Sequence, residues 1–196
     1  MLREVSRILA QLKGERFMGG LIAKAVWRQG GEMKEAEGLT VLRDRKDTVI
    51  ACGRIGDTSL TLTMLLGRFD PKDLEKEIAA ARAEAAKETR DESLAWRPWH
   101  TFTPEEVAAF VNAVNDVNTI HQGEQPVVPG LLILERLLQT PEYEGAASLT
   151  LKFVRPAFSG EALFLCTQQG PKTLILRELT DDAPKHAVLG AFGCIV

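Results

Sequence analysis

The chain has 196 residues, of which 45% are apolar, 6% aromatic and 26% charged. This composition is typical of a globular protein with a sizeable core and excludes a disordered or fibrous chain. The formal net charge of −3 gives no whole-chain electrostatic footprint for nucleic acid or an anionic membrane. We expect neither a membrane span nor a secretory signal. Cys52, Cys166 and Cys194 are an odd number at wide spacing, which favours a reducing, cytoplasmic location without disulfide framework or metal site.

The first part of the chain predicts two helices followed by three strands. Apolar residues at helical spacing indicate a helix over residues 2–12, and residues 21–27 fit a second helix after the Gly19-Gly20 break. The hydrophobic period then changes. Turn residues separate three predicted strands, at 39–43, 48–55 and 58–66.

A charged segment divides the chain. Asp70-Pro71 is a helix start, with an N-cap residue and a proline at the first helical position. The following residues mix both charge signs around a narrow apolar stripe, which is typical of a solvated helical connector. The sequence therefore predicts three segments: an N-terminal α+β region at 1–69, a connector at 70–95 and a second domain at 96–196.

The second domain combines two helices with a sheet. Thr103 to Glu106 form a capping box, so a helix begins at Pro104. Pro129-Gly130 opens a short helix to Gln139 that is apolar almost all round and should be buried. Four strand-like runs follow, at 148–154, 162–167, 173–179 and 187–196. We expect them to form an antiparallel meander wrapped around the central helix.

Three groups between residues 121 and 139 are candidates for chemistry. Glu135 interrupts a run of apolar residues on the buried helix, where burial should raise its pKa unless the carboxyl is paired. Gly130 lies at the helix N-terminus, where free N–H groups attract developing negative charge. With His121 on the preceding loop, these groups suit proton abstraction beside a carbonyl. Each also has a structural interpretation: a hydrogen-bonded loop histidine, a carboxylate paired with Arg136, and a plain helix start.

The pattern H-x4-P-x2-P-G-x4-E-x3-Q resembles the signature of the 3-hydroxyacyl-(acyl carrier protein) dehydratases, the FabA/FabZ type of hotdog fold. Six residues stand in register with it: His121, Pro126, Pro129, Gly130, Glu135 and Gln139. Residues 151–160 resemble a further strand of that family, so the resemblance covers roughly residues 100–196. It implies an α+β hotdog fold, an antiparallel sheet around a central helix. It also implies a homodimer or higher oligomer, because the family takes the histidine and the carboxylate of one site from opposite protomers.

A second resemblance points to a different acid. The spacing Asp116-x-Asn118-x-x-His121 is similar to that of the MaoC-like (R)-specific enoyl-CoA hydratases, a sister hotdog group whose Gly before the aspartate is here Asn115. The two patterns share His121 and disagree on the acid. We favour Glu135, because both its spacing and the Pro-Gly helix start match one family. Asp116 has the structural alternative of capping a helix end or forming a turn.

The resemblances imply reversible dehydration of a (3R)-hydroxyacyl thioester to a trans-2-enoyl thioester, with no metal or redox cofactor. His121 would take the C2 proton, the Gly130 N–H would stabilise the enolate oxygen, and protonated Glu135 would give a proton to the departing hydroxyl. The acyl group would be carried on the phosphopantetheine of acyl carrier protein or coenzyme A. The candidates to contact it are Pro129, Arg136, Gln139, Lys152, Arg155 and Lys172. Each of the Arg and Lys residues has the structural alternative of a solvated surface cation. Two alternatives stay open, a hotdog thioesterase and a non-catalytic acyl-binding subunit.

The first half faintly mirrors the second. Gly20-Leu21-Ile22 followed by strands matches Gly130-Leu131-Leu132 followed by strands, and at this offset His121 falls on Gln11 and Glu135 on Ala25. The first half is therefore either a degenerate second hotdog without the catalytic pair or an unrelated α+β extension. A degenerate repeat would supply a pseudo-dimer partner within one chain.

Overall fold

The computed structural model describes residues 1–30, 36–67, 95–153, 156–167, 172–178 and 186–195, and at 95–96 and from 166 onward only their backbone course. Its helices are α1 (Leu2–Leu9), α3 (Pro104–Val114) and α4 (Gly130–Leu138), with 3₁₀ turns η1 (Glu15–Phe17), η2 (Thr119–His121) and η3 (Pro141–Tyr143). Its strands are β1 (Leu21–Gln29), β2 (Gly38–Asp44), β3 (Thr48–Ile55), β4 (Thr58–Leu65), β5 (Ala95–Thr101), β6 (Ser148–Phe153), β7 (Ala162–Thr167), β8 (Lys172–Glu178) and β9 (His186–Ile195). The predicted connector at 70–95 lies, up to its last residue, outside the described residues.

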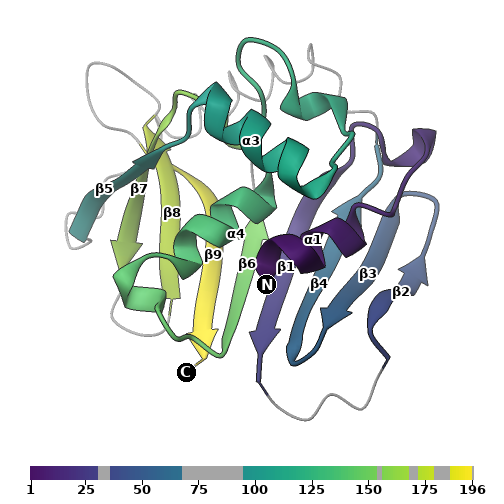
Figure 1. The fold of residues 1–196 in the computed structure, drawn as a ribbon. Coiled ribbons are helices and arrows are strands. Elements are labelled where there is room, and N and C mark those ends of the chain that lie inside the picture. The colour runs from purple at the N-terminus through teal and green to yellow at the C-terminus, as the bar shows by residue number, and fades with distance from the viewer. Residues whose placement is uncertain (31–35, 68–94, 154–155, 168–171, 179–185, 196) are drawn as a thin grey trace.

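The strands form one antiparallel sheet in the order β2-β3-β4-β1-β6-β9-β8-β7-β5. Strands β1 and β6 pair at its middle, with Ala25 opposite Leu151 and Trp27 opposite Leu149. Helices α1 and α4 lie side by side against one face of the sheet, and α3 crosses above them (Figure 1). Among the described residues, no helix is long and apolar enough to cross a bilayer.

The two halves of the sheet repeat one plan. In the first half the order outward from the centre is β1-β4-β3-β2, and in the second it is β6-β9-β8-β7, followed by the additional edge strand β5. Helix α1 precedes β1 as α4 precedes β6. This repeat of a helix and four strands favours the interpretation of the first half as a second, smaller unit of the same fold.

The predicted second helix at residues 21–27 is wrong, because this segment is strand β1. Its buried residues Ala25 and Trp27 alternate with less buried neighbours, which is the period of a strand. The strand pairs with β4 on one side and β6 on the other, and this double pairing outweighs a local pattern too short to tell helix from strand. The match of residues 20–22 to 130–132 is wrong for the same reason, since β1 corresponds to β6 and not to α4.

Two further expectations for the second half need correction. The last four strands do not form a simple meander, because β6 pairs with β9 rather than with its successor β7. Strand β5 was not predicted at all. It contains Pro98, which cannot donate to a sheet ladder and is tolerated because β5 is an edge strand.

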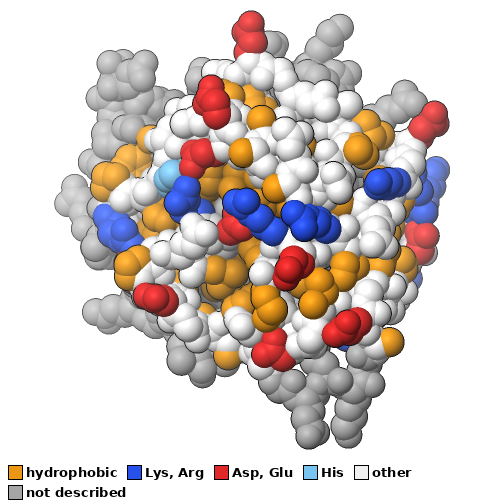
Figure 2. All heavy atoms as spheres, in the orientation of Figure 1, with side chains coloured by type: hydrophobic (Ala, Val, Ile, Leu, Met, Phe, Trp, Pro, Cys, Tyr) orange, Lys and Arg blue, Asp and Glu red, His pale blue; other side chains and the backbone are white. Residues whose placement is uncertain are grey.

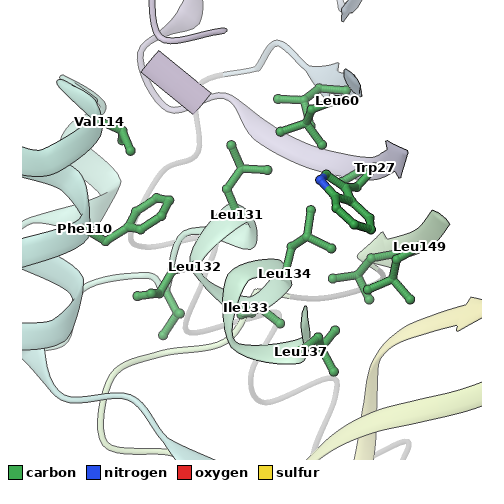
Figure 3. Packing of buried hydrophobic residues seen from close by; sticks show 14 of the residues in the cluster. Trp27, Leu60, Phe110, Val114, Leu131, Leu132, Ile133, Leu134, Leu137 and Leu149 are labelled. Atoms are coloured by element: carbon green, nitrogen blue, oxygen red, sulfur yellow. The ribbon is translucent and has the colours of Figure 1, made fainter. Parts of the chain in front are cut away.

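Helix α4 occupies the centre of the core, as predicted from its apolar sequence. Figure 3 shows its side chains pointing outward in several directions, toward α3 on one side and the sheet on the other. Leu134 and Leu137 are 0% exposed. The helix is therefore enclosed on most of its circumference and fixes the distance between α3 and the sheet.

Helix α1 packs directly against strand β3 in the first half of the sheet. A Cβ added to Gly53 of β3 would lie 3.1 Å from side-chain atoms of both Val5 and Leu9. The side chain of Arg7 donates to the Ala113 carbonyl at the end of α3. Figure 2 shows charged side chains of both signs across the middle of this face. Helix α1 is thus attached both to its own half of the sheet and to the helices of the other half.

The predicted capping box of α3 is confirmed and extends into a polar network. Thr103 and Glu106 exchange side-chain and backbone hydrogen bonds. The Glu106 carboxylate also accepts from His100 of β5 and from Arg136 of α4. Although burial raises its pKa, the Thr103 N–H, His100 and Arg136 together hold the pKa of Glu106 below its ordinary value. One carboxylate therefore joins β5, α3 and α4.

Leu134→Ala should lower the free energy of unfolding by about 2–5 kcal/mol, because it leaves a cavity that the enclosed helix cannot close. Urea titration measures this change. The matched control is Leu42→Ala on the edge strand β2, where the side chain is 54% exposed and the change should stay within about 0.5 kcal/mol. Equal effects of the two substitutions would contradict the central place of α4 in the core.

Candidate active site

The site begins where α3 ends. Asn115, the C-cap of α3, has φ 58° and ψ 38°, the left-handed conformation. Asparagine is the non-glycine residue that adopts this conformation most readily. The residue that departs from the hydratase pattern therefore keeps the backbone geometry that a glycine would provide, and the turn brings Asp116 out of the helix.

Asn118 attaches the loop after α3 to the other half of the molecule. Its Oδ1 accepts from the Gly19 N–H and its Nδ2 donates to the Gly20 carbonyl, each at 2.9 Å. Its own N–H donates to Asp116 Oδ1 at 2.9 Å. Asn118, predicted as part of an alternative acid site, thus holds Asp116 and the start of β1 together. An amide side chain is not an acid at neutral pH, so Asn118 cannot donate a proton to a substrate.

The contacts of the His121 ring determine its orientation and its tautomer. Its Nδ1 lies 2.7 Å from the Val127 carbonyl oxygen, and its Nε2 lies 3.6 Å from Asp116 Oδ2. Since a carbonyl only accepts, Nδ1 carries the proton and Nε2 of the neutral ring presents a lone pair. The Val127 N–H in turn donates to the Ile120 carbonyl. The exposed residues 122–125 lie in the loop that these two bonds close.

The side chain of His121 is only 8% exposed, and its protonation is affected accordingly. Burial lowers its pKa below the ordinary 6.5, while the Asp116 carboxylate and the bond to Val127 act in the opposite direction. The net result is an imidazole that is neutral at neutral pH. Nε2 and the carboxylate of Asp116 are then two acceptors at a separation that a water molecule or hydroxyl can bridge.

The N-terminus of α4 faces the same space. Its N-cap residue is Pro129, which offers no side-chain cap, so the first N–H groups of the helix are available to an acceptor. The first residue of the helix must be glycine, because a Cβ at Gly130 would lie 2.8 Å from Cζ of Phe153. Close packing against this ring brings the helix start to the cavity wall.

These groups line a cavity of about 280 Å³. Asp116, Asn118, His121, Pro129 and Gly130 are all on its wall, and the remaining wall is largely apolar. Much of that wall comes from the first half of the chain, through α1, η1, β1 and β4. No local sequence signal indicates this contribution, since the residues concerned look like ordinary core residues.

The predicted acid Glu135 is engaged elsewhere. Its carboxylate accepts two hydrogen bonds from Arg3 of α1, at 2.8 and 2.9 Å, and it is not among the residues that line the cavity. An ion pair with two parallel hydrogen bonds to a guanidinium is a strong and geometrically specific contact. This position therefore ties α1 to α4.

The predicted substrate contacts are scattered. Pro129 lines the cavity, whereas Arg136 donates to Glu106 and Gln139 is exposed at the end of α4. Lys152 is exposed on β6. Arg155 lies outside the described residues, and of Lys172 only the backbone is described. Within the described ranges, no three side chains among His, Cys, Asp and Glu gather closely enough to hold a metal ion.

Comparisons with known proteins find similarity in structure. No protein-family model matches the chain, and no curated protein matches its sequence. HtdX from Mycobacterium tuberculosis is similar in fold, with a TM-score of 0.53 and 13% identity over 98% of this chain and 83% of that one. A MaoC-like dehydratase from Phytophthora capsici gives a TM-score of 0.51 and 12% identity, over 94% and 72%. The 12:0-ACP thioesterase from Umbellularia californica gives 0.50 and 13%, over 92% and 76%.

At these identities the likeness shows the fold alone. The chain has an α+β hotdog fold, with an antiparallel sheet packed against a central helix, and the predicted fold class is confirmed. The solved structures match nearly the whole chain, so both halves take part in the likeness.

Gly130→Ala should lower the free energy of unfolding by about 1–3 kcal/mol, because the added methyl group overpacks the contact with Phe153. In the double variant Gly130→Ala/Phe153→Leu the shorter side chain makes room. Its loss in urea unfolding should therefore be smaller than the sum of the two single losses. Strict additivity, or a Gly130→Ala variant as stable as the wild type, would contradict the close approach of helix and ring.

Proposed function

We propose that the protein catalyses reversible hydration of trans-2-enoyl thioesters to (3R)-hydroxyacyl thioesters, with Asp116 and His121 as the catalytic pair. The observation that carries the proposal is the approach of His121 Nε2 to Asp116 Oδ2, 3.6 Å, on the wall of an apolar cavity that also contains the start of α4. The fold likeness to a MaoC-like dehydratase supports the same class of reaction.

The pair is Asp116 with His121 rather than Glu135 with His121. Asp116 faces the imidazole and the cavity, whereas Glu135 is bound by Arg3. The Glu135 spacing that resembles the FabA/FabZ signature is accounted for by this contact between α1 and α4. Both members of the proposed pair come from one chain, so the site does not need a carboxylate from a second protomer.

One base is enough for the proton balance. In the hydration direction, a water held between His121 Nε2 and Asp116 loses a proton to Nε2 as its oxygen attacks C3. The electrons of the double bond move onto the thioester oxygen. The imidazolium then returns the proton to C2, so that one water has been added and the imidazole is neutral again. The Asp116 carboxylate stabilises the imidazolium between these steps, which offsets the cost of burying its charge.

The developing enolate oxygen needs a fixed donor. The N–H groups at the uncapped start of α4 and the positive end of the helix dipole supply it without reorganisation. Gly130 lets the helix start lie at the cavity wall. The reaction therefore uses two loop side chains for the proton and the backbone of α4 for the charge.

A thioesterase is the second candidate, because the chain is also similar in fold to an acyl-ACP thioesterase. The water held by Asp116 and His121 would then attack the thioester carbon. Coenzyme A thioesters distinguish the two functions, since hydration removes the enoyl absorbance whereas hydrolysis releases a free thiol.

Asp116→Asn and His121→Gln should each reduce kcat/KM for hydration of a trans-2-enoyl-CoA by about two to four orders of magnitude, because each removes a positioned proton-transfer group. Arg3→Ala is the control, since it breaks the ion pair of Glu135 without touching the cavity; its kcat/KM should stay within about threefold. Full activity in Asp116→Asn, or release of thiol without hydration in the wild type, would overturn the proposal.

The pH profile of kcat/KM should show one acidic limb. Activity requires neutral His121, so it is constant above the His121 pKa and falls as pH drops through it. Because burial lowers that pKa, the limb lies below the ordinary value of 6.5. In Asp116→Asn the residual activity should have its limb at still lower pH, since the carboxylate raises the pKa of the imidazole. A limb that moves upward in this variant would contradict the assigned pair.

A further inference from the structure

The pairing register of β1 and β4 shows along which line the cavity extends. On β1 and β4, the paired residues Leu21 and Leu65 belong to its wall, and so do Ile22 and Met64 in the next row. Leu62, which pairs with Ala25, is the last residue of β4 on the wall. The wall therefore spans four rows of the sheet, of which the Lys24–Thr63 row contributes no residue, and it ends at Leu62.

The end nearest Leu65 is the catalytic and solvent side. Gly20, which precedes Leu21, holds Asn118 of the catalytic loop. Leu65 and Val117, both on the wall, are 50% and 52% exposed. A substrate reaches the catalytic pair from this side, and any chain that continues past it must run toward Leu62.

The opposite end is closed by the contact of α1 with the sheet. The second row beyond Leu62 pairs Trp27 with Leu60, which are both buried in the packed core and are not on the cavity wall. In the same row lies Gly53, on which α1 sits with no room for a Cβ. The wall residue of α1 farthest from the catalytic side is Ser6, which is 1% exposed and whose hydroxyl donates to the Leu2 carbonyl.

We infer that Ser6 and Leu62 form the floor of an acyl-chain cavity and limit the length of the acyl group. This inference rests on the proposed function, because it assigns the thioester to the catalytic side and the chain to the apolar interior. Most side chains on the wall between the two ends are apolar, and the Ser6 hydroxyl is already satisfied within its helix. The occupant is therefore the hydrocarbon tail of the thioester, selected by volume and not by hydrogen bonds.

The side-chain volumes at the floor determine how long an acyl chain fits. Ser6 is the smaller of the two residues, so the chain end can approach α1 closely at this point. Replacing it by leucine would place two more heavy atoms in the path of the chain. One methylene more or less in an apolar pocket changes kcat/KM by about tenfold or more. The length of the chain that fits should thus change by a step that kinetics can resolve.

The test measures kcat/KM for crotonyl-, octenoyl-, dodecenoyl- and hexadecenoyl-CoA with wild type, Ser6→Leu and Leu62→Ala. For each variant, kcat/KM for the longest thioester that the wild type accepts is divided by kcat/KM for crotonyl-CoA. In Ser6→Leu this ratio should fall about tenfold or more. In Leu62→Ala the same ratio should rise, because the floor is deepened. Gln11→Leu is the matched control: it adds leucine to an exposed residue that follows α1 and is not on the wall, so its ratio should equal that of the wild type.

Unchanged ratios in both variants, or equal losses at all lengths, would overturn the floor while the proposed function stands. Ser6→Val is the smaller substitution to use if Ser6→Leu does not fold. A wild type that hydrates none of the four thioesters would instead count against the proposed function. The floor is then judged by the rise in Tm that saturated acyl-CoAs of the same lengths cause: a shorter length limit in the Ser6 variant supports it, and identical limits contradict it.

Discussion

The proposed chemistry depends on one hydrogen bond, from His121 Nδ1–H to the Val127 carbonyl. This bond fixes the tautomer, so the lone pair of the ring is on Nε2, the atom that faces Asp116. The acceptor is itself held, because the Val127 N–H donates to Ile120 and the residue bridges to Phe158. Without this arrangement the imidazole could turn or exchange its proton, and the two acceptors opposite the water would become a donor and an acceptor.

The two halves of the molecule share one arrangement of helix and strands but contribute different parts of the site. The second half supplies Asp116, His121 and the start of α4. The first half supplies much of the cavity wall and, through Gly19 and Gly20, the backbone that holds Asn118. The halves share one sheet through β1 and β6, so the relative position of wall and catalytic loop is set by main-chain pairing. The half without candidate catalytic residues thus forms much of the wall around the site.

The sequence allowed the fold class to be predicted because its strongest signals are local. The capping box at Thr103, the apolar helix after Pro129 and the turn residues between strands each act within a few residues. Strand β1 was misassigned because its apolar run fits both periods, and only pairing on two sides decides between them. Strand β5 was missed because Pro98 argues against a strand until the edge position is known.

The candidate site was predictable in its members and not in its pairing. His121, Asp116 and Gly130 were all identified from spacing, and the left-handed turn at Asn115 explains why asparagine stands there. The role of Glu135 depends on Arg3, a residue 132 positions earlier in the chain, and no local pattern reveals such a partner. Contacts of this kind also place the cavity wall, which is why Ser6 and Leu62 could not be distinguished from ordinary core residues.

Nitrogen-15 NMR of the histidine side chains tests the central claim most directly, with His121→Gln to assign the signals. The account predicts that at neutral pH the His121 ring is neutral, with a proton on Nδ1 and an unprotonated Nε2. A ring that is protonated on Nε2 at neutral pH, whether as the other tautomer or as the imidazolium, would contradict it.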